Sequence, residues 1–356
     1  MKVGIFSPYL DTLTGGEKYI FTAASCLSKE HSVVVYWDDS EIIEKASKKF
    51  NLDLSKVIVK PNIFSGGTGL VKKLIETAKL DRLFYLSDGS IPFVSCKLIV
   101  HFQFPVEWVN TNSFPLLFKK SRISKVVCNS YFTKSYIDSK FGIKSYVLYP
   151  PATHSETNKD IDQRENLILT VGRFSSLPNG TDFKKLDFLV RVFKKFQKKR
   201  LKGWKMVIVT SVGQDQEKNF QEFEDGVKSS HIAIYKNPGF ETITSLYAKA
   251  KVYWHAAGYG EDLQKFPERA EHFGISTVEA MSYGAIPIVI DAGGQKEIVK
   301  DGENGFLWKT EEELIAKTHK VAVDKKLFSQ ISKEAKSASA NFSDKRFCEE
   351  LNHLIW

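Results

Sequence analysis

The chain has 356 residues, a formal net charge of +9 and 42% hydrophobic residues. This length and composition predict a globular protein of two ordinary domains rather than a disordered chain. We find no run of 18 apolar residues, so no membrane-spanning helix is expected. A basic stripe interleaved with aromatic residues is also absent, so nucleic acid is not expected as a partner. The positive charge suits an anionic substrate, an anionic membrane surface or simply a lysine-rich proteome.

Four cysteines lie far apart, at Cys26, Cys96, Cys128 and Cys348. The sequence has no CxxC pattern and no Cys/His cluster, so we expect neither a zinc site nor a disulfide framework. The apolar run at the N-terminus is too short for a signal peptide. We therefore expect a reducing, cytoplasmic location.

The first half of the chain alternates short apolar runs with amphipathic segments, which predicts parallel strands joined by helices. Strands are expected over 2–7, 31–37, 57–59, 83–86, 96–102, 126–129 and 145–149. The first strand leads through Gly15-Gly16 into a helix over 17–28, an arrangement that suits contact with phosphate. The loop lacks the GxGxxG pattern, so a dinucleotide cofactor is not expected. A simple tight turn is the competing interpretation of these glycines.

Two features of this half have a functional and a structural interpretation. His101 is near the carboxyl end of an expected strand, where α/β sheets place ligand sites, although a lone histidine is more often structural. Residues 104–125 combine large apolar side chains with four basic ones, which would suit docking at an anionic membrane. A core helix with a solvated basic end explains that segment equally well.

Pro150-Pro151 and the polar run over 153–165 predict a linker. A second α/β domain is expected beyond it, beginning with a strand over 167–171 that ends at Gly172-Arg173. Helices are expected over 183–199, 243–250, 311–323, 325–338 and 346–356, and strands over 206–210, 231–235 and 251–254. The charged loop over 259–270 is expected to be mobile.

The most informative stretch runs from Glu271 to Asp301 and reads EHFGISTVEAMSYGAIPIVIDAGGQKEIVKD. Glu271 and Glu279 flank a small-residue turn that opens a helix, and Gly293-Gly294 opens another after a buried strand. Carboxylates accept hydrogen bonds from hydroxyl groups, and helix N-termini favour anions, so the stretch suits a sugar and a diphosphate together. Either glutamate alone is more often a solvated charge on a helix.

This stretch, with the later DGENGFL, resembles the donor-site signature of the family-4 retaining glycosyltransferases of the GT-B fold. The wording EHFGI is similar to the branch that contains dolichol-linked mannosyltransferases. The resemblance implies two Rossmann-like domains whose parallel sheets face each other across a cleft. It implies an acceptor domain over 1–150, with a C-terminal helix at about 343–356 that packs back on it, and a donor domain over 151–342.

The resemblance also implies roles for individual residues. Glu271 would contact the donor sugar, Glu279 the ribose, and Arg173 and Lys184 the diphosphate, with Lys185 as an alternative to Lys184. Gly16 would approach the diphosphate, and His101 would act on the donor sugar or the acceptor. The turn that would offer its amides to the donor consists of Phe273, Gly274, Ile275 and Ser276.

The function implied is retaining, metal-independent transfer of a sugar from a nucleotide-diphosphate sugar to a glycan or lipid-linked acceptor, without a cofactor. The acceptor would belong to polysaccharide or glycoconjugate biosynthesis. Peripheral contact with the cytoplasmic face of an anionic membrane is compatible with it. Two alternatives are a nucleotide-sugar epimerase of the same fold and a non-catalytic protein that binds a nucleotide sugar.

Overall fold

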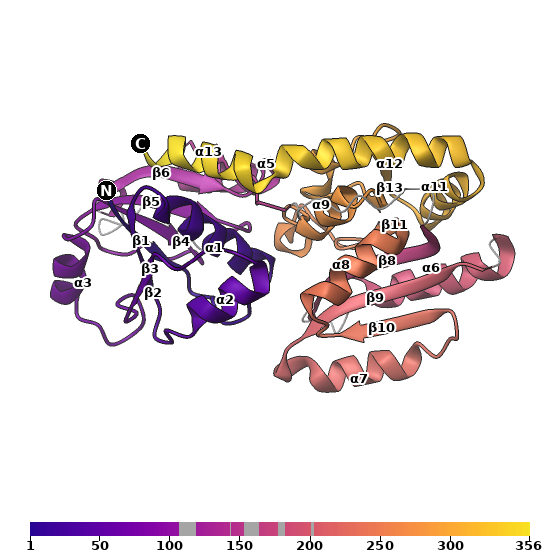
Figure 1. Ribbon diagram of the computed structural model, residues 1–356, viewed down its shortest axis with the longest axis horizontal. Helices are drawn as coiled ribbons and strands as arrows, with labels where there is room; N and C mark the ends of the chain where they lie inside the picture. The colour runs from indigo at the N-terminus through magenta and orange to yellow at the C-terminus, as the bar shows by residue number, and fades with distance from the viewer. Residues whose placement is uncertain (107–118, 143, 153–163, 177–181, 201–202) are drawn as a thin grey trace. The chain divides into compact units, whose positions relative to one another are not determined.

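The structure, a computed structural model, describes residues 1–106, 119–142, 144–152, 164–176, 182–200 and 203–356. It divides into two compact units, Met1–Pro151 with Phe342–Trp356, and Ala152–Asn341. Each unit is built on one sheet of parallel strands (Figure 1). The prediction of two Rossmann-like parallel sheets is therefore confirmed.

The sheet of the first unit has the strand order β3-β2-β1-β4-β5-β6-β7. Its strands are β1 Lys2–Phe6, β2 Ser32–Tyr36, β3 Val57–Lys60, β4 Arg82–Leu86, β5 Lys97–Phe102, β6 Ile123–Cys128 and β7 Tyr146–Val147. Its helices are α1 Gly15–Ser28, α2 Ile42–Phe50, α3 Leu70–Thr77, α5 Tyr131–Phe141 and α13 Asp344–Ile355. The strand order reverses beside β1, and ligands of open α/β sheets bind at such switch points.

The sheet of the second unit has the strand order β10-β9-β8-β11-β12-β13. Its strands are β8 Glu165–Phe174, β9 Lys205–Val212, β10 Ile232–Lys236, β11 Ala250–His255, β12 Ile286–Ile290 and β13 Phe306–Trp308. Its helices are α6 Leu186–Arg200, α7 Glu217–Gly226, α8 Phe240–Lys249, α9 Ile275–Ser282, α10 Gln295–Ile298, α11 Glu311–Val323 and α12 Lys325–Ser339.

Two elements of the second unit, α7 and β13, are not among the predicted ones. The three-residue strand β13 is too short to show an apolar period. It is recognised as a strand only by its pairing with β12, in which Ile288 is aligned with Phe306. In α7, the buried Phe220 and Phe223 are three residues apart among charged neighbours, so the apolar signal is weak. No described helix of either unit is both long and apolar enough to cross a bilayer.

The C-terminal helix α13 belongs to the first unit and packs on α1. Phe347, Leu351 and Ile355, spaced as one helix face, are buried in the same core as Ile20 and Leu27 of α1. The guanidinium of Arg346 also donates a hydrogen bond to the carbonyl oxygen of Tyr149 at 2.8 Å. These contacts attach the last twelve helical residues to the sheet formed by the first 150.

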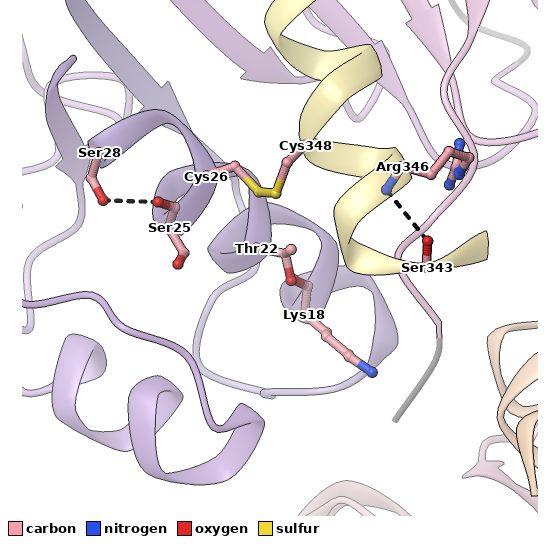
Figure 2. Close-up of a disulfide and its surroundings, with 8 residues drawn as sticks. All are labelled: Lys18, Thr22, Ser25, Cys26, Ser28, Ser343, Arg346 and Cys348. Carbon is pink, nitrogen blue, oxygen red and sulfur yellow. Dashed lines mark hydrogen bonds between the residues drawn. A yellow bond between two sulfur atoms is a disulfide. The ribbon is translucent and has the colours of Figure 1, made fainter. Parts of the chain in front are cut away.

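A disulfide joins the two helices, between Cys26 of α1 and Cys348 of α13 (Figure 2). The expectation that no disulfide forms is therefore wrong for this pair, because 322 residues of sequence separate cysteines whose Cα atoms lie 5.4 Å apart. Cys96 and Cys128 are buried free thiols. The cysteine spacing consequently gives no support to a reducing compartment.

We expect two reactive thiols per denatured chain without reductant and four after reduction. Because the bond closes a very long loop, its reduction should lower the free energy of unfolding by about 3 kcal/mol. Thiol titration and thermal unfolding with and without dithiothreitol measure both effects. The double variant Cys26→Ser/Cys348→Ser should unfold at the same temperature with and without reductant. Four thiols before reduction would contradict the disulfide.

Candidate active site

Glu271 makes a largely buried contact with two basic side chains of the second unit. One carboxylate oxygen, Oε2, accepts hydrogen bonds from Lys184 Nζ at 2.5 Å and from His255 Nε2 at 2.8 Å. The side chains of Lys184, Glu271 and His255 are 15%, 17% and 2% exposed. His255 ends β11, so the contact forms at the carboxyl edge of the sheet, where α/β proteins bind ligands.

The two basic groups keep the carboxylate of Glu271 ionised. Burial alone would raise its pKa, but the charge of Lys184 and the hydrogen bond from His255 outweigh burial and hold the pKa well below its usual range. Burial lowers the pKa of His255, so its imidazole is neutral at pH 7 and donates from Nε2. The site therefore presents an acceptor-only carboxylate, one of whose oxygens is already bonded.

The structure distinguishes between the two candidate lysines. Lys184 reaches Glu271, whereas Lys185 forms an ion pair with Glu261 at 2.5 Å. Glu261 also pairs with Arg269 at 2.7 Å, and its side chain is only 7% exposed. These bonds anchor the 259–270 loop, which was predicted to be mobile.

Gly172 explains how Lys184 reaches Glu271. A Cβ atom at Gly172 would lie 2.8 Å from Lys184 Cε and 3.0 Å from its Cγ, so the absence of a side chain at Gly172 leaves room for the lysine stem in its present position. Asp182 fixes the preceding turn, because its carboxylate accepts the amide hydrogen of Leu186 at 2.9 Å, at the start of α6.

Arg173 is part of β8 rather than of the loop after it. The strand continues to Phe174, and Arg173 is aligned with Ser211 of β9, so the predicted strand end at 171 is too early. Its side chain is exposed at the same carboxyl edge as His255. Arg173 and Lys184 thus lie on neighbouring segments of this edge.

The turn before α9 has the conformation that its glycine permits. Gly274 has φ +117°, which favours glycine, and Ile275 and Ser276 form the first helical turn. The N-cap residue is Gly274, which has no side chain to cap this N-terminus, and the preceding Phe273 is buried at 2% exposure. The amides at the start of α9 are therefore suited to an anion.

Two tyrosines position the polar residues of α9. The hydroxyl of Tyr253 donates to the carbonyl oxygen of Val171 at 3.2 Å, so it accepts from Ser276 Oγ at 2.7 Å. Tyr247 donates to Glu279 Oε2 at 3.0 Å. The sequence analysis did not assign Tyr247, Tyr253 or His255 to the site. For His255, its position at the end of an expected strand was a signal that could have identified it.

The second glycine turn packs closely against the loop that carries Glu271. Gly294 donates its amide hydrogen to the carbonyl oxygen of Glu271 at 2.8 Å. A Cβ atom at Gly294 would lie 2.4 Å from the carbonyl oxygen of His272. The amide of Gly294 is therefore bonded within the protein, and the expectation that this turn faces an anionic ligand stays a prediction for its other amides.

The structure places Gly16 and His101 in the first unit. Gly16 lies in the first turn of α1, close to Gln103, which donates from Nε2 to the carbonyl oxygen of Gly16 at 3.2 Å. The carboxylate of Glu17 accepts the amide hydrogen of Thr14 at 2.6 Å, so a negative charge already lies at this helix end. The contact of Gly16 with phosphate stays a prediction.

His101 is part of the core of the first unit. Its ring has no exposed surface, stacks on Tyr19 at 4.3 Å between ring centroids, and shares a hydrogen bond of 3.2 Å with the carbonyl oxygen of Val127. Burial lowers its pKa to about 3. This environment favours the structural interpretation of His101.

Residues 107–118 of the predicted membrane segment and 177–181 of the loop before Lys184 lie outside the described residues.

A family model and curated relatives match this chain. The family model "Glycosyl transferases group 1" matches residues 153–338. A GDP-Man:Man(3)GlcNAc(2)-PP-Dol alpha-1,2-mannosyltransferase of Dictyostelium discoideum is 22% identical over all of this chain and 84% of its own length. The Homo sapiens enzyme of that name is 23% identical, over 98% of this chain and 85% of its own.

Solved structures show the same fold. Anabaena HepE in complex with UDP and glucose superposes with a TM-score of 0.72, at 16% identity, over 100% of this chain and 99% of its own. A glycosyltransferase from Rickettsia africae superposes with a TM-score of 0.74, at 14% identity, over 99% of this chain and 97% of its own. At these identities the likeness concerns the fold alone.

Gly294→Ala should lower the free energy of unfolding by about 3 kcal/mol, because the added methyl group meets backbone atoms that cannot move aside. Gly226→Ala is the matched control, since a Cβ atom there has open space and the position ends a helix. It should leave stability unchanged or raise it slightly. Denaturant unfolding of both variants measures the contrast, and equal stabilities would contradict the packing role of Gly294.

Lys184→Met should lower the free energy of unfolding by about 3 kcal/mol at pH 7, because it leaves a buried carboxylate without its cation. In the wild type the pKa of Glu271 is lowered on folding, so its contribution is present above the unfolded value and is lost as pH falls below about 4.5. The variant has no such contribution to lose on acidification. The difference in free energy of unfolding between wild type and variant, measured by denaturant unfolding, should therefore shrink as the pH falls. Lys309→Met, which removes an exposed partner of Asp291, should change stability by under about 0.5 kcal/mol at every pH.

Proposed function

The chain belongs to the glycosyl transferases group 1 family, and from this premise we propose that it transfers mannose from GDP-mannose to a lipid-linked oligosaccharide with retention of configuration. The contact of Glu271 with Lys184 and His255 carries this proposal, because it places an ionised carboxylate, suited to sugar hydroxyls, beside a cation suited to phosphate. Full-length similarity to GDP-mannose-dependent enzymes acting on a dolichol-linked acceptor supports the choice of donor and acceptor.

Glu271 is suited to hold the donor sugar. An ionised carboxylate only accepts hydrogen bonds, and a hexose offers only hydroxyl donors to it. Lys184 and His255 both bind Oε2, so Oε1 is the oxygen through which we expect Glu271 to accept sugar hydroxyls.

Arg173, Lys184 and the N-terminus of α9 are suited to hold the diphosphate. An ammonium group has three donors, and Glu271 uses one of those of Lys184. Fixed positive charge and helix amides beside the departing group stabilise the charge that develops on it. Glu279, held by Tyr247, would accept hydrogen bonds from the ribose hydroxyls.

In the proposed step, the bond between the anomeric carbon and the diphosphate oxygen breaks. A bond from the same carbon to an acceptor hydroxyl oxygen forms on the same face. The hydroxyl proton passes to the departing diphosphate, so no protein nucleophile is required. The chain's own part is to orient the sugar through Glu271 and to stabilise the diphosphate through Arg173 and Lys184.

We further propose that the reaction needs no metal and that the protein acts at the cytoplasmic face of a membrane. The described residues contain no group of three His, Cys, Asp or Glu side chains placed to bind a metal ion. Metal independence is tested directly by transfer in excess EDTA. Neither an epimerase nor a non-catalytic nucleotide-sugar-binding protein is supported by the relatives named above.

Incubation of the purified chain with a short lipid-linked oligosaccharide and GDP-mannose, UDP-glucose or UDP-galactose tests the proposal. Transfer from GDP-mannose, with an alpha linkage in the product, is expected. Arg173→Ala should lower kcat by about 100-fold or more, as removal of a charge-stabilising donor does. The control Arg191→Ala, which removes an exposed partner of Glu311, should retain full activity.

Transfer from a UDP-sugar alone would overturn the donor assignment, and full activity of Arg173→Ala would overturn its role at the diphosphate. Isomerised donor without acceptor would support the epimerase instead. An inverted linkage would contradict the proposed step.

A further inference from the structure

Glu261, in the loop over 259–270, binds two cations of the second unit with its two carboxylate oxygens. Oε1 accepts a hydrogen bond from Lys185 Nζ at 2.5 Å, and Oε2 accepts one from the guanidinium of Arg269 at 2.7 Å. The side chains of Lys185, Glu261 and Arg269 are 10%, 7% and 18% exposed. Burial raises the pKa of Glu261, but the hydrogen bonds from Lys185 and Arg269 outweigh burial and lower it. Glu261 is therefore an ionised carboxylate whose two oxygens are both bonded within the protein.

The two partners of Glu261 are neighbours, in the sequence, of two residues of the candidate active site. Lys185 directly follows Lys184. Arg269 lies two residues before Glu271. The side chains of Lys184 and Glu271 are bonded to each other at 2.5 Å. Glu261 consequently connects the same two backbone segments that this bond connects, from a separate loop.

Lys185 has a backbone conformation that lysine rarely adopts. Its φ is +59°, in the left-handed region, where the Cβ atom of an L-residue makes the conformation unfavourable. Only three other described non-glycine residues have a positive φ, and two of them are asparagines, which tolerate it. Because residues 184 and 185 share a planar peptide unit, a change of φ at Lys185 would reorient the segment that carries Lys184. The buried bond to Glu261 thus holds the side chain of the residue whose backbone is strained.

Aromatic packing attaches the loop that carries Glu261 to α6. The ring of Tyr259 lies 4.2 Å from that of Phe188 of α6 and 5.3 Å from that of Trp308, measured between ring centroids. Phe188 and Trp308 are themselves part of the core of the second unit. The loop is therefore held by contacts that do not involve the bond between Lys184 and Glu271.

We propose that Glu261 is a positioning residue for the donor site. By binding Lys185 and Arg269 together, it keeps the two backbone segments at a fixed separation. Lys184 is thereby kept within reach of Glu271, and both side chains are kept in the arrangement that the donor needs. The inference rests on the proposed function and deepens it, since Lys184 and Glu271 are the residues proposed to hold the diphosphate and the sugar.

Binding of GDP and of UDP to the full chain, measured by isothermal titration calorimetry, tests this role. Glu261→Gln keeps the shape of the side chain but removes its charge, so Lys185 and Arg269 are no longer held by a carboxylate. It should weaken binding of the nucleotide that the wild type binds by about tenfold. It should lower kcat/KM for sugar transfer by about 100-fold, the effect of a displacement of about 1 Å.

Glu311→Gln is the matched control in the same unit. Glu311 also binds two cations, Arg191 at 3.0 Å and Lys195 at 2.6 Å, and its side chain is 11% exposed. These cations do not adjoin Lys184 or Glu271 in the sequence. Nucleotide binding by Glu311→Gln should stay within about twofold of the wild type.

Two substitutions of Lys185 separate the effect of its backbone from that of its charge. Lys185→Ala removes the ion pair but keeps a Cβ atom, so the left-handed conformation is no longer held and nucleotide binding should weaken by about tenfold. Lys185→Gly removes the same ion pair, but glycine adopts this φ without strain. Its nucleotide binding should stay within about threefold of the wild type. A role in stability alone would affect both variants alike.

Equal nucleotide binding by Glu261→Gln and Glu311→Gln would overturn the positioning role, and so would an equal loss in Lys185→Ala and Lys185→Gly. Thermal unfolding without nucleotide shows which variants are folded, and the two Lys185 variants decide the question if Glu261→Gln is not. Binding of UDP but not GDP by the wild type would overturn the donor assignment alone, and the variants would then be compared with UDP. Absence of binding to either nucleotide would overturn both the proposed donor site and the role of Glu261.

Discussion

The site of the second unit depends on a single carboxylate oxygen that accepts hydrogen bonds from both Lys184 and His255. Three segments meet there: the turn before α6, the end of β11 and the loop before α9. Burial by itself raises the pKa of this carboxyl group, and the charge of Lys184 and the hydrogen bond from His255 lower it. The cation and the neutral imidazole therefore keep Glu271 ionised within the fold.

Two glycines allow this contact. Gly172 leaves room for the stem of Lys184, and Gly294 allows its turn to lie against the backbone of residues 271–273. A Cβ atom at Gly294 would meet backbone atoms, whereas one at Gly172 would meet the side chain of Lys184. Packing around Glu271 therefore fixes the geometry of this contact within the second unit.

The first unit has a different character, because its notable residues are either deep in the core or fully outside it. His101 stacks on Tyr19 in the interior, and α13 is attached to α1 by apolar packing and a disulfide. In contrast, α3 leaves Leu70, Val71 and Ile75 at least half exposed. These side chains contribute little to folding, since their apolar area stays in contact with water.

The sequence by itself determined the two parallel α/β sheets, most strand and helix positions, and the family, because apolar periodicity and the run from Glu271 to Asp301 are local signals. It also singled out Glu271, Glu279 and Arg173. Only the tertiary structure decided between Lys184 and Lys185, added His255, Tyr247 and Tyr253, assigned Gly294 to packing and His101 to the core, and joined Cys26 to Cys348. Each of these depends on which side chains meet across tens or hundreds of residues, and no local pattern in the chain records such distances.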